Sequence, residues 1–159
     1  MKATPSPGAD GVGVATSGAD GVGVATSGAA EVTRVMTALH PAVTIDGVTA
    51  VAHFEPQPEH RGNHGWLHGG LAATVLDHVC ARAAAAALGH RVVTGKLDLR
   101  YPRPVPLDAG PYRVEATAAA VRGRAVRVRG AIVGPDGRAM VEARALFLIR
   151  PQAHVESSS

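Results

Sequence analysis

The apolar residues between positions 69 and 88 recur with the period of an α-helix. No proline interrupts this segment, alanine is very frequent in it, and Gly89 follows as a typical C-terminal cap. The apolar line runs through Leu71, Val75, Val79 and Ala83. The pattern therefore predicts one long helix from Gly69 to Leu88, with a length of about 30 Å.

After this helix the period changes to that of a β-strand. Apolar and polar residues alternate between positions 93 and 101, which is typical of a half-buried strand. The polar side of this pattern holds Thr94, Lys96, Asp98 and Arg100. The prolines at 102, 104 and 106 then end the strand, because proline cannot donate to a central ladder.

Further strands are predicted on both sides of these elements. Three of them, at 112–121, 124–133 and 139–149, are separated by short turns and indicate an antiparallel meander. Residues 48–54 form another strand, followed by a polar loop at 55–67 that prolines and glycines interrupt. A single helix of this length must bury itself against the sheet. We therefore predict an α+β architecture in which the sheet curls around a central helix.

The two ends of the chain differ from its middle. Residues 8–17 read GADGVGVATS, and residues 18–27 repeat this sequence letter for letter. A segment so poor in large side chains cannot offset its ordering entropy by burial, and two copies are too few for a solenoid. We expect a disordered tail at 1–30, a folded domain at 31–151 that opens with a short amphipathic helix at 31–39, and a flexible tail at 152–159.

Composition restricts the class of protein. The chain has 159 residues, of which 46% are hydrophobic and 18% are charged, as expected for one globular domain. Cys80 is the only cysteine, and no stretch reads as a targeting signal or a membrane helix. We expect a cytoplasmic protein without a membrane partner. The net charge of +3 comes mainly from dispersed arginines, which are typical of solvated strand faces; binding of a phosphate-bearing cofactor is the alternative, and we expect no nucleic-acid partner.

A candidate site begins at His68-Gly69-Gly70, where the long helix starts. The first backbone N–H groups of a helix have no partner within it, and the helix dipole is positive there. The two glycines leave these donors unshielded, an arrangement that stabilises an oxyanion. A glycine pair that only lets the loop turn into the helix is the alternative.

Asp77 lies in the middle of the same helix among apolar residues. A carboxylate there either faces a cavity, meets a partner or lies on a solvent-facing stripe. Gly69 and Asp77 are separated by about 12 Å along the helix axis, so one carbonyl group cannot contact both. If both act in one reaction, Gly69 must come from another subunit. Two such helices packed antiparallel about a twofold axis would form two composite sites, which predicts a homodimer.

Other residues offer weaker signals. The Thr94 hydroxyl could hold a water or the carboxylate, although threonine also suits a strand. Asn63 and His64 in the preceding loop could orient a water, although loops favour such residues. His60, His64 and His68 recur every fourth residue, but glycines and prolines argue against a helical metal stripe there, and we expect no metal.

Three further catalytic arrangements are disfavoured. Asp77 and His78 are neighbours and diverge on a helix, so they form no simple dyad. A cysteine in mid-helix, like Cys80, is usually a buried apolar group. The chain contains no G-x-S-x-G motif, so a serine hydrolase of that type is not supported.

In the segment GWLHGGLAATVLDHV the chain resembles the hot-dog fold acyl-CoA thioesterases related to the phenylacetate-pathway and 4-hydroxybenzoyl-CoA enzymes. The resemblance covers roughly residues 48–150 and includes Thr94, the Tyr101-Pro102-Arg103-Pro104-Val105 turn, Gly123-Arg124, Asp136-Gly137 and Ala143-Arg144-Ala145. It implies a curved antiparallel sheet around one central helix. It also implies a homodimer or a dimer of dimers, with coenzyme A required only as part of the substrate.

The resemblance assigns roles to individual residues. The Gly69 N–H would polarise the thioester carbonyl with support from Gly70, and Asp77 of the facing subunit would activate water or attack directly. Thr94 would help to place the water, and His68 would shape the loop. Many members carry an asparagine six positions before the motif histidine, where this chain has Gly62, so Asn63 and His64 belong to a different loop. Arg100, Arg103 and Arg124 are the candidates for contacts with coenzyme A phosphates.

Two rival functions remain at this point. The substrate could be an acyl group on an acyl carrier protein, or the chain could be an acyl-binding module without turnover. A dehydratase is less well supported, since no separate acid and base are placed for elimination.

Overall fold

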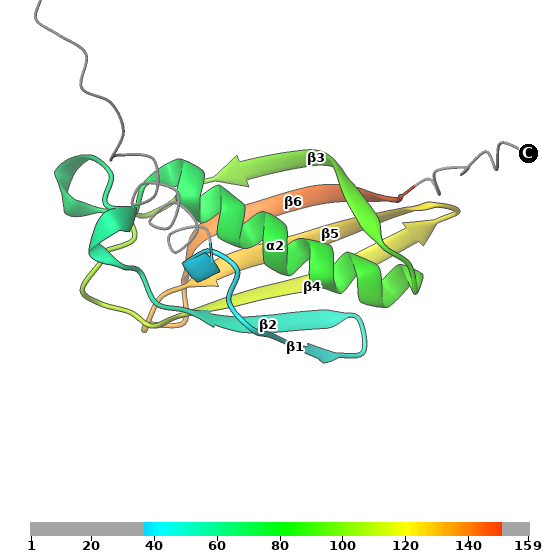
Figure 1. Ribbon diagram of the computed structural model, residues 1–159, viewed down its shortest axis with the longest axis horizontal. Coiled ribbons are helices and arrows are strands. Elements are labelled where there is room, and N and C mark those ends of the chain that lie inside the picture. The colour runs from blue at the N-terminus through cyan, green and yellow to red at the C-terminus, as the bar shows by residue number, and fades with distance from the viewer. Residues whose placement is uncertain (1–36, 151–159) are drawn as a thin grey trace, which may run out of the picture.

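The computed structural model describes residues 37–150 and consists of one long helix and six strands (Figure 1). The elements are β1 (Val43–Asp46), β2 (Thr49–Phe54), α2 (Gly69–Leu88), β3 (Val92–Arg100), β4 (Tyr112–Arg122), β5 (Ala125–Val133) and β6 (Ala139–Ile149). Two short 3-10 helices, Pro58–His60 and Asn63–Gly65, lie in the loop before α2. The predicted long helix is confirmed from its first residue to its last.

The expectations for the two ends of the chain stay predictions. The tails at 1–30 and 152–159 lie outside the described residues, as does most of the helix expected at 31–39. Of that helix, Thr37 and Ala38 are described and helical, and Leu39 is completely buried.

The strands form one antiparallel sheet in the order β1-β2-β4-β5-β6-β3. The predicted meander is confirmed for the last three strands, which pair consecutively. β3 does not pair with the next strand along the chain; it pairs with β6 and forms one edge of the sheet. β1 was not predicted, because its four residues are too few for a clear strand pattern; it pairs with β2 at the other edge.

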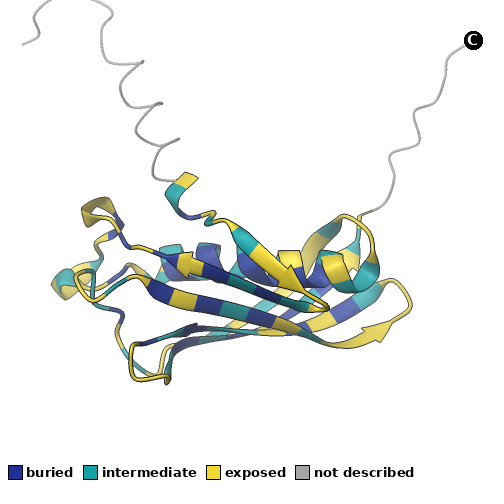
Figure 2. Ribbon diagram, turned by 90° about the horizontal axis from the view of Figure 1, so that it is seen from below, coloured by how far each residue is buried: buried dark blue, intermediate teal, exposed yellow. Residues whose placement is uncertain are grey.

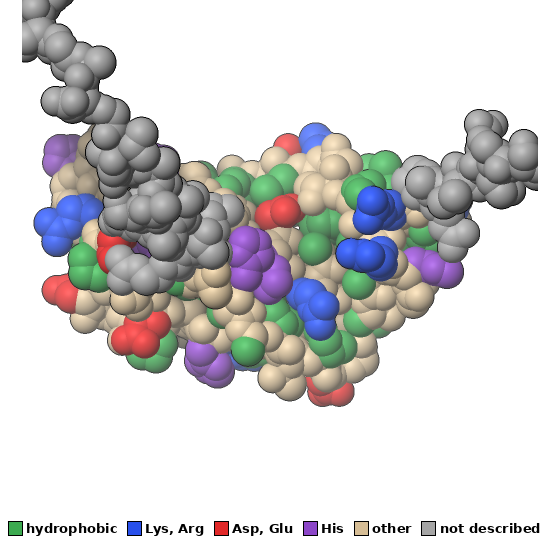
Figure 3. Space-filling view, in the orientation of Figure 1, with side chains coloured by type: hydrophobic (Ala, Val, Ile, Leu, Met, Phe, Trp, Pro, Cys, Tyr) green, Lys and Arg blue, Asp and Glu red, His purple; other side chains and the backbone are tan. Residues whose placement is uncertain are grey.

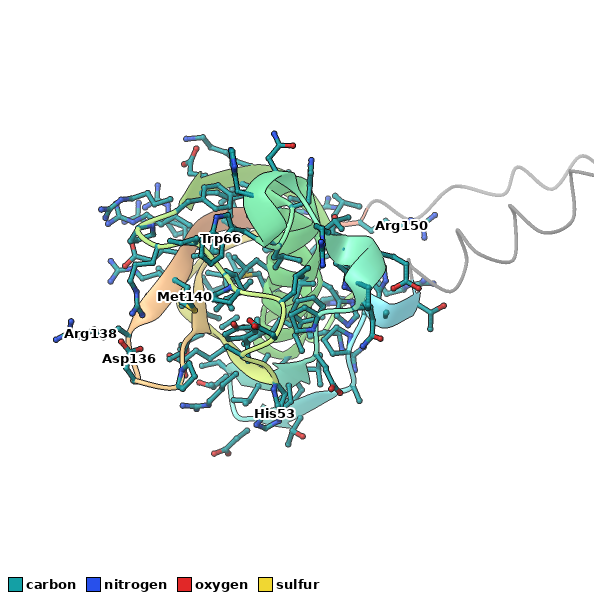
Figure 4. All side chains as sticks on the ribbon, turned by 90° about the vertical axis from the view of Figure 1, so that its left-hand side faces the viewer. His53, Trp66, Asp136, Arg138, Met140 and Arg150 are labelled. Carbon is teal, nitrogen blue, oxygen red and sulfur yellow. The ribbon has the colours of Figure 1, made fainter. Side chains whose placement is uncertain are left out.

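α2 packs along the sheet, which curls around it when viewed from the end (Figure 4). Figure 2 shows the alternation of buried and exposed residues along the strands. The buried residues of α2 are Ala72, Val75, Leu76, Val79, Cys80, Ala83 and Ala84. The helix is long and apolar enough to cross a membrane by length and composition. In this structure the side of α2 that carries these buried residues packs against the sheet, as in the core helix of a globular domain.

The helix and the sheet lie close together at Gly130 of β5. A Cβ atom at this position would lie 2.7 Å from Cys80 Sγ and 3.2 Å from the Glu115 carbonyl oxygen. Only glycine therefore lets β5 pass the helix at this distance. Because Gly130 faces α2, its neighbours Arg129 and Ala131 point to the outer face of the sheet.

Candidate active site

The first turn of α2 contains one N–H group without an acceptor. His68 is the N-cap residue, and its Nδ1 accepts a hydrogen bond of 3.1 Å from the Gly70 N–H. The His68 carbonyl accepts from Leu71 N–H at 3.0 Å and from Ala72 N–H at 3.1 Å. Among residues 37–150, nothing accepts from the Gly69 N–H. The Gly69 N–H is thus the open donor of this turn, and it lies at the positive end of the helix dipole.

Tyr101 holds the same turn from the other side. Its hydroxyl donates a hydrogen bond of 2.8 Å to the Gly69 carbonyl oxygen, and its ring lies 3.6 Å from where a Gly69 Cβ would be. Burial raises the pKa of the Tyr101 phenol, so the hydroxyl keeps its proton and remains a donor. The sequence indicated Tyr101 only as part of a turn. Its contact with Gly69 depends on where β3 ends, which the pattern could not show.

Asp77 and Thr94 form the second part of the site. The Thr94 hydroxyl donates a hydrogen bond of 2.8 Å to Asp77 Oδ1. Among the described residues nothing binds Oδ2, so this oxygen is available to a water or a substrate. Acidic and histidine side chains are exposed near the middle of the face formed by α2 (Figure 3).

The sequence pattern placed Thr94 on the same side of the strand as Lys96, and this prediction is wrong. Thr94 pairs with the buried Phe147, whereas Lys96 pairs with Leu146 on the outer face. A bulge between Thr94 and Lys96 shifts the register by one residue, and such a shift moves side chains to the other face. Thr94 therefore faces α2, while Lys96, Asp98 and Arg100 face away from it. The bulge is what brings Thr94 to Asp77.

The neighbours of Asp77 have other roles. Cys80 is completely buried, and burial, with the Asp77 charge as a smaller cause, raises the pKa of its thiol to about 12. A thiolate at neutral pH is thus strongly disfavoured. His78 lies against the segment before β1: its Nε2 is 3.3 Å from the Pro41 carbonyl oxygen, and its ring centroid is 4.8 Å from that of His40. Burial is the main cause that lowers the pKa of His78.

The loop before α2 is tied down by backbone hydrogen bonds. The Gly62 N–H donates to the Trp66 carbonyl at 2.7 Å, and the His68 N–H donates to the His60 carbonyl at 2.9 Å. A Cβ atom at residue 62 would lie 2.9 Å from His68 Cα, so this backbone leaves no room for an asparagine there. The departure from the family pattern at Gly62 therefore has a steric reason.

Asn63 and His64 form an exposed bend of this loop. His64 has a φ of 61°, and within residues 37–150 neither side chain forms a hydrogen bond. His60, in contrast, is fully buried; its Nδ1 accepts from the Gln57 N–H at 3.0 Å and its ring stacks on Phe54. The three histidines at 60, 64 and 68 thus have different environments. In the described part of the chain, no group of three or more metal-ligating side chains occurs.

The three arginines expected at coenzyme A phosphates do not come together. Arg100 forms an ion pair of 3.2 Å with Glu142. Arg103 binds both carboxylate oxygens of Asp136, at 2.7 and 3.1 Å, and also the carbonyls of Ala139 and Arg138. Arg124 lies in the turn before β5, next to the end of β6. The guanidinium groups of Arg100 and Arg103 are thus already bound by carboxylates of the same chain.

The Arg103–Asp136 pair fixes the hairpin between β5 and β6, whose tip carries Asp136 and Arg138 (Figure 4). The pKa of Asp136 is lowered to about 2, mainly by the hydrogen bonds from the Arg103 side chain and secondly by the hydrogen bond from the Arg138 backbone N–H. Asp136 is therefore ionised throughout the neutral range.

Known proteins with a similar sequence or fold include members of the thioesterase superfamily. The sequence profile of the thioesterase superfamily matches residues 64–141, which include Gly69, Asp77 and Thr94. No match is found among curated protein sequences.

Solved structures with the same fold include a thioesterase superfamily protein. A thioesterase superfamily protein from Shewanella loihica PV-4 is 26% identical, with a TM-score of 0.60 over 70% of this chain and 91% of that one. AziG from S. sahachiroi is 24% identical, with a TM-score of 0.65 over 71% and 94%. The E. coli PaaI protein, from the phenylacetic acid degradation operon, is 17% identical, with a TM-score of 0.62 over 76% and 91%. With the profile match and this shared fold, the chain belongs to the hot-dog thioesterase superfamily, which supports a hydrolase activity.

Proposed function

We propose that this protein hydrolyses the thioester of an acyl-CoA in a composite site between two copies of the chain. Asp77 of one subunit acts as general base or nucleophile, and the Gly69 N–H of the facing subunit binds the carbonyl oxygen. Coenzyme A takes part only as a portion of the substrate.

The observation that carries this proposal is that one helix holds both an open N–H donor and an oriented carboxylate. The Gly69 N–H is the open donor of the first turn, and Asp77 is oriented by Thr94 at 2.8 Å. The two lie about 12 Å apart along α2, which is too far for one thioester. A twofold axis between antiparallel α2 helices would bring Asp77 of each copy to Gly69 of the other. The dimer itself, or a dimer of dimers, is part of the proposal.

The reaction follows from these groups. In the general-base route, water attacks the carbonyl carbon, and its proton passes to Asp77 Oδ2. The Gly69 N–H stabilises the oxyanion that forms. The C–S bond then breaks, and the thiolate takes the proton from Asp77 to leave as free thiol. In the nucleophilic route, Asp77 attacks the carbonyl and expels the thiolate, and water then hydrolyses the acyl-enzyme anhydride.

His68 contributes as a cap in both routes. Its Nδ1 lone pair accepts from the Gly70 N–H, so that nitrogen cannot also accept a proton from water without losing the cap. Its role is therefore to hold the first turn in place.

Exposed aromatic side chains near the start of α2 support binding of an apolar acyl group. Trp66 is 41% exposed and Tyr101 is 49% exposed, although large apolar side chains of this kind are usually covered. Figure 4 shows Trp66 at the end of the molecule where α2 begins. Because the E. coli relative comes from a phenylacetic acid degradation operon, phenylacetyl-CoA is the first aromatic substrate to test.

The direct test is release of free thiol from aromatic, medium-chain and long-chain acyl-CoAs by wild type and by Asp77→Ala. Hydrolysis that is lost in the variant supports the proposal. If acyl-CoAs are bound but not hydrolysed, and acyl groups on a carrier protein are also left intact, an acyl-binding module is the better account. Hydrolysis restricted to carrier-bound acyl groups would keep the chemistry and replace the substrate.

A mixed-dimer experiment tests the composite site. Gly69→Pro removes the donor and is compatible with the first helical position, and the extended His68 suits a residue before proline. Equal mixing of Asp77→Ala and Gly69→Pro chains, each inactive alone, would restore about a quarter of wild-type activity, because half of the dimers contain one intact site. Mixed dimers that stay inactive would contradict a site shared between subunits.

A further inference from the structure

The outer face of the sheet, away from α2, contains a cavity of about 400 Å³ that the proposed hydrolytic site does not use. Arg129, Ala131 and Arg144 contribute to its lining, and all three alternate with residues that face α2. Gly130, which lies between Arg129 and Ala131, is one of these inward-facing residues, since a Cβ atom there would point at Cys80 in α2. The cavity and the Asp77–Thr94 pair thus lie on opposite faces of the sheet.

Two arginines stand directly opposite each other in this cavity. Arg129 of β5 and Arg144 of β6 are partners in the strand register, and both are exposed. Directly opposed side chains have Cβ atoms only about 5 Å apart, and like charges in such positions are destabilising. Within residues 37–150 neither guanidinium forms an ion pair or a side-chain hydrogen bond.

The acidic groups around this pair are already engaged. Asp98, which stands opposite Arg144 in β3, forms an ion pair with Lys96 at 2.8 Å. Glu142 pairs with Arg100 at 3.2 Å. Glu115 pairs with Arg113 at 3.0 Å. Among residues 37–150, no carboxylate forms an ion pair with the two opposed arginines, which therefore concentrate positive charge at this point.

The shape of the cavity gives this charge room to bind a ligand. In the next row of the sheet, Ala131 stands between Glu115 and Glu142, and its methyl group leaves the centre of the row hollow. The glutamates on either side disfavour anions beyond the arginine pair. Guanidinium groups present paired N–H donors that match the oxygens of a phosphate group, and two of them can bind one dianion together.

We propose that Arg129 and Arg144 form a binding site for a phosphate group of a ligand, separate from the hydrolytic site. The phosphate could belong to the nucleotide part of coenzyme A or to a simpler phosphate. This site does not require the proposed hydrolysis, because its residues and the thioester-cleaving groups lie on different faces of the sheet.

The test measures binding by calorimetry and by amide chemical shifts at low salt. The probes are adenosine 3′,5′-bisphosphate, which is the nucleotide fragment of coenzyme A, inorganic phosphate, and adenosine without phosphate. We expect both phosphates to bind, adenosine not to bind, and shifts to concentrate in β5 and β6 around 129–131 and 142–144. Tighter binding of the bisphosphate than of phosphate assigns the site to a nucleotide, and equal binding assigns it to the phosphate alone.

Matched variants make the test specific. We expect Arg129→Gln and Arg144→Gln each to weaken binding by about tenfold or more, since each removes a charged pair of donors. Arg127→Gln removes the same charge from the same strand and face, outside this cavity, and should change binding by less than about twofold. Should Arg129→Gln impair folding, Arg129→Lys keeps the charge and tests the loss of the paired donors. Absence of phosphate binding, or an equal effect of Arg127→Gln, would overturn the proposal.

Discussion

The Thr94 hydroxyl donates a hydrogen bond of 2.8 Å to Asp77 Oδ1 and thereby joins the start of β3 to the middle of α2. The contact exists because the bulge after Thr94 turns its side chain towards the helix. It fixes one carboxylate oxygen and leaves the other for water. The orientation of the proposed base is therefore set by a residue on a different element.

Thr94→Val should lower kcat by about tenfold with little change in KM, because the carboxylate loses its orienting donor while the substrate contacts remain. Thr94→Ser keeps the hydroxyl and serves as the matched control. Steady-state kinetics on the best acyl-CoA of the panel would provide the comparison. Equal loss in both variants would point to a packing role for Thr94.

Gly69→Pro should lower kcat by about 10²–10³, as expected when one oxyanion donor is removed. Gly69→Ala keeps the N–H, and its methyl group would contact the Tyr101 ring at 3.6 Å without a clash, so it should remain close to wild type. Thermal unfolding of both variants checks that α2 is intact. Similar activity of the two would mean that the Gly69 N–H is not the donor.

Tyr101→Phe should reduce kcat several-fold and leave KM nearly unchanged, because the ring still covers Gly69 while the hydrogen bond of 2.8 Å to its carbonyl is lost. The loss of activity should also vary less from one acyl group to another than it does in a variant that truncates the ring. Comparison of Tyr101→Phe with Tyr101→Ala separates these two contributions. A normal kcat in Tyr101→Phe would limit the residue to covering the turn.

Gly130→Ala should destabilise the protein by about 1–3 kcal/mol, since the added methyl group must displace the helix or the sheet. The contact with Cys80 Sγ at 2.7 Å is the tightest one. Cys80→Ala removes this sulfur, so the double variant should be more stable than the two separate effects predict. Chemical denaturation of all four proteins gives the coupling energy. Simple additivity would show that the clash lies elsewhere.

Asp136 should contribute to stability only above the acid range. Its pKa in the folded protein is about 2, below the ordinary value of 3.8, so the folded state favours the ionised form. This contribution is complete above about pH 4 and is lost as the pH falls towards 2. Thermal unfolding of wild type and Asp136→Asn should thus differ at neutral pH and converge in acid. A constant difference over the whole range would contradict the Arg103–Asp136 linkage.

The sequence predicted most of the elements because their signals are local. The apolar period and Gly89 predicted α2 with its observed bounds, and the strands β4, β5 and β6 were each predicted to within one residue at either end. β1 was missed because a strand of four residues is too short to show a clear pattern. The amphipathic helix predicted at 31–39 is described only at its end, where Leu39 is buried.

The candidate site was predicted only in part. The HGG motif and Asp77 could be recognised in the sequence because both lie on one helix, where spacing converts directly into distance. Thr94 was proposed for the right contact but placed on the wrong face, because strand alternation cannot reveal a bulge. Tyr101 was missed as a site residue, since its partner lies thirty-two positions away in the chain.

The sequence by itself determined the helix, the strand periods, and the separation of Gly69 from Asp77 that requires two subunits for the proposed reaction. Only the tertiary structure decided that β3 joins the sheet beside β6, that Thr94 faces Asp77, and that Arg129 stands opposite Arg144. The physical reason is the range of the interactions. Helical spacing and alternation depend on neighbouring residues, whereas strand order and register are set by pairing and packing between segments distant in the chain.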